Sequence, residues 1–276
     1  MSTQARSLGG KTALVSGGAR GIGRATAKAF VTQGMKVAVG DLDGQLAERA
    51  ACEIGAGTIG LALDVARRES FERAVELVET RLGPLDVLVN NAGIMPVGPF
   101  LEEDDATTRR IIEVNVCGVL HGMKIVLPRF VARGHGHVVN LASMAAKVPA
   151  PGGVTYSGTK HFVLGASAAI RQELRGTGVE VTCVMPGPVH TEMMAGLQPA
   201  RGVRQVSAEE VAAAIVAALR RPRFEVHVPA VAGRMHALSQ LLPRRVREAL
   251  MHALRTDRVL TQIDHAARRA YDERVR

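Results

Sequence analysis

The chain has 276 residues, 47% of them apolar and 22% charged, which allows one large α/β domain and excludes a disordered chain. Its three widely spaced cysteines fit neither a disulfide framework nor a zinc site, and no apolar run reaches the roughly 18 residues of a membrane-spanning helix. The net charge of +9 belongs mostly to the C-terminal part, because thirteen arginines stand against six acidic residues from Arg220 onward. The polar N-terminus lacks the apolar block of a secretory signal, so we expect a cytoplasmic protein. From the cysteine spacing we expect no metal site.

Apolar runs of strand length alternate with helical patterns, which predicts a parallel sheet with helices on both faces. Strands are expected at Thr12–Ser16, Lys36–Asp41, Gly57–Leu63, Leu85–Asn90, Gly136–Leu141, Val179–Val184 and Phe224–Pro229. The longest helices are expected at Thr107–Arg133 and Thr155–Arg175. This continuous rhythm predicts a single doubly wound, Rossmann-like domain over residues 1–230, followed by a helical extension over residues 231–276.

The first predicted strand runs directly into a glycine-rich turn and then a helix. The turn reads Ser16-Gly17-Gly18-Ala19-Arg20-Gly21-Ile22-Gly23. Gly17 permits the tight turn, Gly21 lets the backbone approach a pyrophosphate, and Gly23 allows close packing of helix and strand. The free N–H groups and positive dipole end of the helix favour phosphate binding there. A dinucleotide site is therefore predicted at this turn.

The second predicted strand ends at Asp41, 18 residues after Gly23. A carboxylate at this place accepts both ribose hydroxyls of adenosine and repels a 2′-phosphate, so it favours NAD over NADP. Arg20 points the other way, because a basic residue within the turn can pair with that phosphate. We expect Asp41 to prevail, since it faces the discriminating hydroxyl more directly.

Small and polar residues also follow the third and fourth predicted strands. They are Asp64-Val65 and Asn90-Asn91-Ala92-Gly93. Ligands of open α/β sheets bind outside the carboxyl ends of the strands, so these residues suit a long, flat cofactor. Turn chemistry is the other explanation, because Asn and Gly supply unusual backbone angles.

Tyr156 and Lys160 are four residues apart in a helical pattern and therefore share one helical face. A free phenol has a pKa near 10. An adjacent ammonium, and the positive nicotinamide of NAD⁺, would lower that pKa and make Tyr156 a proton donor and acceptor. Ser143, 13 residues upstream, can hold a substrate oxygen beside the phenol. Asn115 lies inside a predicted helix, where it is either tolerated on the surface or placed to hold water.

Taken together, these residues resemble the short-chain dehydrogenase/reductase family over about residues 10–229. The matching motifs are Gly17-x-x-x-Gly21-Ile22-Gly23, Asp64-Val65, Asn90-Asn91-Ala92-Gly93, Asn115, Ser143, Tyr156-x-x-x-Lys160 and Pro186-Gly187-Pro188-Val189-His190-Thr191. One departure is visible: Ser16 stands where the family usually has Thr. The change is conservative and leaves the predicted cofactor site intact.

The resemblance implies a catalytic set and a cofactor cradle. Tyr156 would give or take the substrate proton, Ser143 would orient the reacting oxygen, Lys160 would hold the nicotinamide ribose and tune Tyr156, and Asn115 would anchor a water linking Lys160 to solvent. The implied cofactor contacts are Asp64 and Val65 to adenine, Asn91, Ala92 and Gly93 to the adenosine side, and Val189 and Thr191 to the nicotinamide amide, with Pro186 and Gly187 in the same motif.

Two segments are expected to line the substrate pocket, Met144–Thr155 and His190–Val206, with Met95 nearby. They are rich in Met, Ala, Val and Pro. Such a lining favours a hydrophobic secondary alcohol or ketone, such as a steroid-, retinoid- or lipid-like compound. The alternatives are an NADPH-dependent ketone or 3-oxoacyl reductase, and a dinucleotide-binding module without turnover.

The extension combines apolar and basic residues at helical spacing. The apolar positions are Leu241, Leu242, Val246, Leu250, Ala253 and Leu254, opposite Arg244, Arg245, Arg247 and Arg255. Such a helix either lies on an anionic membrane or docks its apolar face on its own domain or a partner subunit. Without a recognisable motif or aromatic platform, nucleic acid is not expected as a partner. The resemblance implies a homodimer or homotetramer formed through Thr107–Arg133 and Thr155–Arg175.

Overall fold

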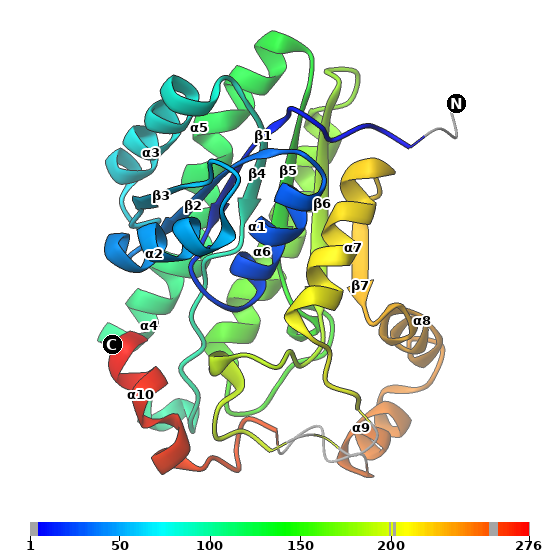
Figure 1. Ribbon diagram of the computed structural model, residues 1–276. Helices are drawn as coiled ribbons and strands as arrows, with labels where there is room; N and C mark the ends of the chain where they lie inside the picture. Colours follow the sequence, from blue (N-terminus) through cyan, green and yellow to red (C-terminus); the bar gives the residue numbers. More distant parts are fainter. Residues whose placement is uncertain (1–4, 199, 201–202, 254–258, 276) are drawn as a thin grey trace.

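The computed structural model describes residues 5–198, 200, 203–253 and 259–275, and seven strands form one parallel sheet in the order β3-β2-β1-β4-β5-β6-β7 (Figure 1). The strands are β1 (Thr12–Ser16), β2 (Lys36–Asp41), β3 (Ile59–Ala62), β4 (Leu85–Asn90), β5 (Gly136–Leu141), β6 (Val179–Pro186) and β7 (Glu225–Val228). The predicted Rossmann-like sheet is therefore confirmed, and β1, β2, β4 and β5 have the predicted bounds.

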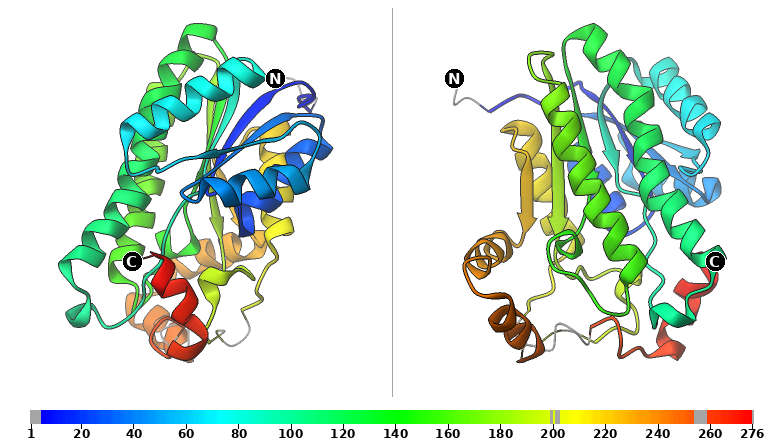
Figure 2. Two further views of the ribbon diagram at one scale, coloured as in Figure 1. Left: turned by 60° about the vertical axis from the view of Figure 1, so that its left-hand side comes forward. Right: turned by 180° about the vertical axis from the view of Figure 1, so that it is seen from behind.

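Helices cover both faces of the sheet, so the central strands are apolar on both sides. The helices of the main domain are α1 (Gly21–Thr32), α2 (Gly44–Ile54), α3 (Arg68–Leu82), α4 (Asp105–Ile112), α5 (Gly118–Arg133), α6 (Val154–Glu173) and α7 (Ala208–Arg220). One core cluster joins the sheet to α1, α2 and α7, and the second joins it to α3, α5 and α6. Figure 2, right, shows α5 and α6 lying across the second face.

The strand order reverses between β1 and β4, and a crevice opens at the carboxyl ends of strands at such a point. Ser16 joins the two strand ends: its hydroxyl donates to the carbonyl of Val89 and accepts from the backbone N–H groups of Asn91 (3.1 Å) and Ala92 (3.2 Å). The serine therefore supplies the hydroxyl that the family's usual threonine would supply.

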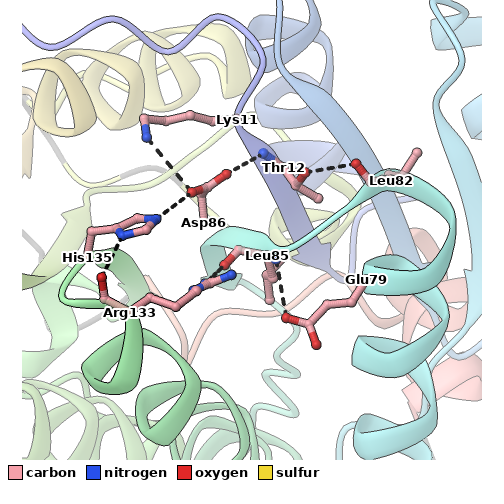
Figure 3. A network of polar contacts seen from close by, with 8 residues as sticks. All are labelled: Lys11, Thr12, Glu79, Leu82, Leu85, Asp86, Arg133 and His135. Carbon is pink, nitrogen blue, oxygen red and sulfur yellow. Dashed lines mark hydrogen bonds and ion pairs between the residues drawn. The ribbon is translucent and has the colours of Figure 1, made fainter.

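A polar network pins the opposite, amino-terminal edge of β1 and β4 (Figure 3). The carboxylate of Asp86 accepts from the backbone N–H of Thr12 at 2.9 Å and pairs with Lys11 and His135 at 3.9 and 3.4 Å. The Thr12 hydroxyl donates to the carbonyl of Leu82. These contacts hold β1 against β4 at the end remote from the crevice.

His137 in β5 makes stability depend on pH. Its ring is 5% exposed and contacts the Thr182 hydroxyl at 2.8 Å, and burial, with a smaller contribution from the Arg6 charge, lowers its pKa from 6.5 to about 3. Below pH 6.5 the unfolded chain therefore binds a proton that the folded chain refuses, so the free energy of unfolding falls as pH falls, by about 1.4 kcal/mol per pH unit until the folded pKa is reached. We expect urea unfolding to show a loss of about 2 kcal/mol between pH 7.5 and 5.0 that His137→Gln removes. The exposed His265→Gln is the control; parallel curves for His137→Gln and wild type would contradict this origin.

The helix predicted over Thr107–Arg133 is continuous from Asp105 to Arg133 and contains one π-helical turn. It consists of α4 and α5 joined by a π-helical turn over Glu113–Cys117, and such turns occur mostly as single widenings, often at functional sites. Among the described residues, only the stretch Asp105–Arg133 is long and apolar enough to cross a membrane; 56% of its apolar window is buried inside the fold, as in a core helix.

The extension contains α8 (Ala230–Ser239), α9 (Arg244–Ala253) and α10 (His265–Val275) in its described part. All three lie at the carboxyl end of the sheet (Figures 1 and 2). Leu254 and Arg255 of the predicted amphipathic helix, and the side chain of Leu250, lie outside the described residues. α10 returns to the main domain, a feature that the sequence pattern does not predict.

Candidate active site

The glycine-rich turn has no room for side chains. A Cβ on Gly23 would lie 2.2 Å from the carbonyl oxygen of Gly17, and a Cβ on Gly21 would lie 3.1 Å from Cγ2 of Thr191. The Asn91 amide donates to the carbonyls of Ser16 and Gly17 at 2.9 Å each and fixes the turn. This is the close backbone approach that a pyrophosphate requires.

Helix α1 begins at Gly21, so the end of the glycine-rich segment, including Ile22, forms the first helical turn. Arg20 occupies the N-cap position of α1 and makes no side-chain hydrogen bond to the helix. The N–H groups of the first helical turn are therefore left to a ligand, and the positive end of the helix favours an anion there. The residues present fit a dinucleotide phosphate.

Asp41 ends β2 beside the same turn. Its carboxylate accepts from the backbone N–H groups of Ala19 (3.2 Å) and Asp43 (3.4 Å). Burial raises the pKa of this carboxyl, although the two backbone donors and the nearby Arg20 oppose the rise. The half-buried carboxylate is thus held at the rim of the crevice.

Arg20 is engaged elsewhere: its guanidinium pairs with Glu192 at 3.1 Å. Glu192 also pairs with Arg274 of α10. Burial would raise the pKa of Glu192, but the hydrogen bonds and charges of Arg274 and Arg20 hold it below its usual value. The basic residue that could pair with a 2′-phosphate is therefore occupied by a carboxylate.

The residues after β3 make turn contacts. Asp64 accepts from the backbone N–H of Ala66 at 3.0 Å and pairs with Arg67 at 3.7 Å. Val65 is buried against Gly118, whose added Cβ would lie 2.9 Å from a Val65 methyl. Both residues border the carboxyl edge, and an adenine contact for them stays a prediction.

Tyr156 lies in the first turn of α6 and is 7% exposed. Ser143 follows β5, and its hydroxyl accepts from the backbone N–H of Ala145 at 3.1 Å. Burial raises the pKa of Tyr156, and a smaller hydrogen-bonding contribution from the Ser143 side chain only partly offsets the rise. The expected lowering by the adjacent ammonium is therefore not produced by the protein's own groups, because desolvation of the phenolate outweighs it.

Lys160 lies on the same face of α6, with Nζ 5.6 Å from the centre of the Tyr156 ring. Its ammonium donates to the carbonyl of Leu141 at 2.8 Å, and burial lowers its pKa to about 8. A Cβ on Gly93 would lie 3.5 Å from Nζ, so the loop after β4 passes directly over the lysine.

Asn115 lies in the π-helical turn and is 1% exposed. Its amide oxygen accepts from the N–H of Ile94, and its amide nitrogen donates to the Ile94 carbonyl, both at 2.9 Å. The same nitrogen donates to the Thr159 hydroxyl at 3.2 Å. Asn115 is thus buried rather than tolerated on the surface. It fixes the loop after β4 against α6 beside Lys160.

The predicted motif after β6 lines the crevice from the other side. Pro186 ends β6, and the N–H of Gly187 donates to the carbonyl of Val228 at 2.8 Å. Val189 forms an isolated bridge with Val206, and Thr191 faces Gly21. The structure therefore brings Thr191 to Gly21 at the glycine-rich turn, and it places Tyr156 beside Lys160 at the carboxyl end of the same sheet.

Three residues of this region were not predicted from the sequence, Arg268, Tyr271 and Arg274, and Glu192 was expected only as part of the pocket segment His190–Val206. Arginines of a polar C-terminal helix are typical of a solvated face, so nothing in their pattern predicts a buried contact. Tyr271 carries the one available signal, because the chain has only two tyrosines. Its role is described below.

Comparison with known proteins agrees with this geometry. The family profile described as short chain dehydrogenase matches residues 11–202. The chain is 37% identical over 223 residues to 1-deoxy-11-beta-hydroxypentalenate dehydrogenase of Streptomyces exfoliatus, covering 78% of this chain and 81% of that protein. It is 34% identical over 198 residues to 2,5-dichloro-2,5-cyclohexadiene-1,4-diol dehydrogenase of Sphingobium indicum, covering 71% and 79%.

Two solved structures share the fold. A short chain dehydrogenase/reductase from Burkholderia phymatum in complex with NAD superposes with a TM-score of 0.78 at 24% identity, covering 86% of this chain and 95% of that chain. A 3-ketoacyl-(acyl-carrier-protein) reductase from Brucella melitensis complexed with NADH superposes with a TM-score of 0.74 at 29% identity, covering 80% and 98%.

Proposed function

The chain belongs to the short-chain dehydrogenase family and is an oxidoreductase acting on CH–OH groups, and from this premise we propose that it transfers a hydride between NAD(H) and a hydrophobic secondary alcohol or its ketone. The observation that carries the proposal is the buried phenol of Tyr156 beside the buried Lys160 ammonium, with the half-buried Ser143 side chain next to the phenol. A non-catalytic dinucleotide-binding module would need no such buried proton donor.

The hydroxyls of Ser143 and Tyr156 have distinct tasks. The Ser143 hydroxyl orients the reacting oxygen, and the Tyr156 hydroxyl donates a proton to that oxygen during reduction or accepts one during oxidation. Because burial raises the pKa of Tyr156, the protein's own groups keep the phenol protonated at neutral pH, which suits proton donation to a ketone. A bound nicotinamide ring supplies or accepts the hydride. Lys160 and Asn115 hold the loop and helix that frame the pair.

NAD is the cofactor that we propose. Asp41 presents a half-buried carboxylate at the rim of the crevice, and Arg20 is paired with Glu192. The two solved relatives are described with NAD and NADH. The alternative is an NADPH-dependent ketone or 3-oxoacyl reductase, which the name of the Brucella relative favours and the Asp41 carboxylate opposes.

The substrate that we propose is apolar and cyclic, of steroid-, retinoid- or lipid-like character. Met95, Tyr156 and Leu197 belong to one apolar cluster at the site, with Met193 and Met194 packed against it. The two curated relatives named above are dehydrogenases of cyclic alcohols. Turnover of cyclic secondary alcohols and ketones, compared with small charged hydroxy acids, tests this class; faster turnover of the hydroxy acids would reject it.

We also propose that the protein works in the cytoplasm as a homodimer or homotetramer. Apolar side chains are exposed on α5 (Val131) and on α6 (Val154 and Phe162), the two long helices that would form a shared bundle. Burying these side chains between subunits would remove them from water. Sedimentation equilibrium gives the subunit number; a monomer at micromolar concentration would reject the proposal.

Contact with an anionic membrane through α8 and α9 is a further part of the proposal. Met235 and Leu238 of α8, and Leu241 in the loop that joins α8 to α9, are 59%, 67% and 82% exposed, and the side chains of Arg234, Arg244 and Arg245 are exposed as well. Exposed apolar and basic side chains on adjoining helices are the combination that binds an anionic bilayer surface.

Flotation with phosphatidylserine vesicles measures this contact. We expect the protein to float and Leu238→Glu combined with Leu241→Glu to abolish flotation, since both carboxylates would enter the bilayer interface. Leu101→Glu, at a 96% exposed leucine elsewhere, is the matched control and should still float. Equal flotation of all three proteins would reject a role for α8 and α9.

A further inference from the structure

A fully buried arginine fastens the C-terminal helix to the main domain. Arg268 of α10 has no exposed surface, and its guanidinium donates to three backbone carbonyls: Met193 (2.9 Å), Ala195 (3.1 Å) and Met95 (2.5 Å). It also pairs with Asp272 on its own helix at 3.1 Å. Burying a guanidinium costs free energy unless its N–H groups are paired. The paired contacts of Arg268 therefore hold α10 in one specific position, and we call these contacts the dock.

Tyr271, one turn further along α10, completes the dock. Its side chain is 5% exposed, and its hydroxyl accepts from the backbone N–H of Met95 at 2.8 Å. The N–H and the C=O of Met95 are therefore both satisfied by side chains of the extension. If α10 left, the Met95 backbone and two further carbonyls would lose their partners.

The two anchored loops flank the catalytic groups. The loop after β4 carries Met95 and passes over Lys160 at Gly93. The loop after β6 carries Met193 and Ala195, and Thr191 within it faces the glycine-rich turn. Arg268 thus joins the two sides of the crevice.

The segment before α10 covers the crevice between these loops. Ile263 forms an antiparallel bridge with Leu197, and Leu260 is buried in the apolar cluster that contains Tyr156. A Cβ on Gly153, just before α6, would lie 2.7 Å from a methyl of Leu260. Residues of the C-terminal extension therefore cover Tyr156.

We propose that Arg268 and Tyr271 are positioning residues that set substrate specificity, because they hold α10 and residues 259–264 as the closing wall of the substrate site. This inference rests on the proposed function. The wall encloses small apolar substrates, and its distance from Tyr156 limits the size of the ring system that fits. The ion pairs of Arg274 and Arg20 with Glu192 extend the same dock to the cofactor turn.

Fluorescence tests the wall without any substrate. The chain has no Trp, and its two tyrosines, Tyr156 beneath the wall and Tyr271 in α10, are both buried, so the tyrosine emission reports on the wall. We expect acrylamide to quench this emission weakly, and the quenching constant to rise about threefold or more in Arg268→Met, because the undocked wall exposes the buried rings. Arg269→Met, at the adjacent exposed arginine of α10, should leave the constant unchanged.

Turnover tests the specificity with cyclohexanone, 1-decalone and a four-ring steroid ketone as probes. We expect Arg268→Met to raise the KM of cyclohexanone and to increase the kcat/KM ratio of the four-ring ketone to cyclohexanone by about tenfold, an effect the size of one or two apolar contacts. Arg268→Lys, which keeps the charge but lacks the planar fork, should fall between Arg268→Met and wild type. Arg269→Met should match wild type.

The outcomes separate the two proposals. Unchanged quenching, or equal loss of kcat/KM on all three ketones, would overturn the wall while leaving the proposed oxidoreductase function intact. Increased quenching in a protein that turns over none of the ketones would support the closing wall and overturn the proposed substrate class. Thermal unfolding of each variant shows whether a uniform loss reflects instability alone.

Discussion

Replacing Tyr156 by Phe is expected to lower kcat by about 10²- to 10⁴-fold, the range that a positioned proton donor contributes. The substitution removes only the hydroxyl, and the ring remains in the apolar cluster with Met95 and Leu197. The affinity for NAD(H) should change little, because the cofactor cradle at the glycine-rich turn is untouched. Steady-state turnover of a cyclic ketone with NADH, together with NADH titration, measures both quantities.

Two further variants locate the effect at the proton. Ser143→Ala removes the hydroxyl that we propose orients the reacting oxygen beside Tyr156, and it should also lower kcat substantially. Tyr271→Phe removes the same atom from the other buried tyrosine and should change KM more than kcat, since that hydroxyl positions Met95. A Tyr156→Phe protein that retains wild-type kcat would refute the assigned chemistry, and NADH binding without turnover in the wild type would favour a binding module.

Much of the fold follows from short-range patterns that the sequence makes visible. β1, β2 and β4 are apolar runs closed by Gly, Asp or Asn, and β5 is an apolar run that ends at Leu141 before Ala142 and Ser143. β3 is shorter than predicted, because Gly57 adopts a positive φ of 73° and belongs to the preceding turn. The π-helical turn at Asn115 was not predicted, because its cause is a long-range contact: the Asn115 amide hydrogen-bonds to the backbone of Ile94 in the loop after β4.

In the candidate site, too, the local features were predictable from the sequence and the long-range ones were not. Glycines at the turn and the pair Tyr156 and Lys160 are recognised by spacing, because each contact is local to one turn or one helical face. The electrostatics were not predictable: the pKa of Tyr156 is raised because the side chain is buried, and its burial depends on segments more than 100 residues away. The expected lowering by Lys160 ignored this desolvation.

The extension shows the limit of pattern-based reasoning most clearly. An arginine on a short, polar helix is typical of a solvated surface. Arg268 is buried because three carbonyls from two distant loops accept its N–H groups. These loops lie more than 70 residues before Arg268 in the sequence, so no short sequence window contains the arginine together with its partners. Long-range polar contacts of this kind become visible only in three dimensions.

Replacing Asp41 by Asn is expected to shift cofactor selectivity from NAD towards NADP by about 10²-fold. A charged acceptor contributes about 1.5–3 kcal/mol per hydrogen bond, and the carboxylate also repels a 2′-phosphate. The ratio of kcat/KM for NADH to that for NADPH measures the shift. Asp43→Asn is the matched control: Asp43 is exposed and caps α2 through the N–H of Leu46, and Asn is an equally good cap.

The size of this shift depends on whether Arg20 is released. Its guanidinium pairs with Glu192, which Arg274 also holds, so in Asp41→Asn the arginine still has a carboxylate partner. Adding Glu192→Gln should therefore increase the preference for NADPH beyond the sum of the single changes, because Arg20 becomes available to the phosphate. Additive effects would mean that Arg20 does not reach the 2′-phosphate. A wild-type protein that already prefers NADPH would instead show that Arg20 leaves Glu192 when the phosphate arrives, and it would favour the ketone or 3-oxoacyl reductase.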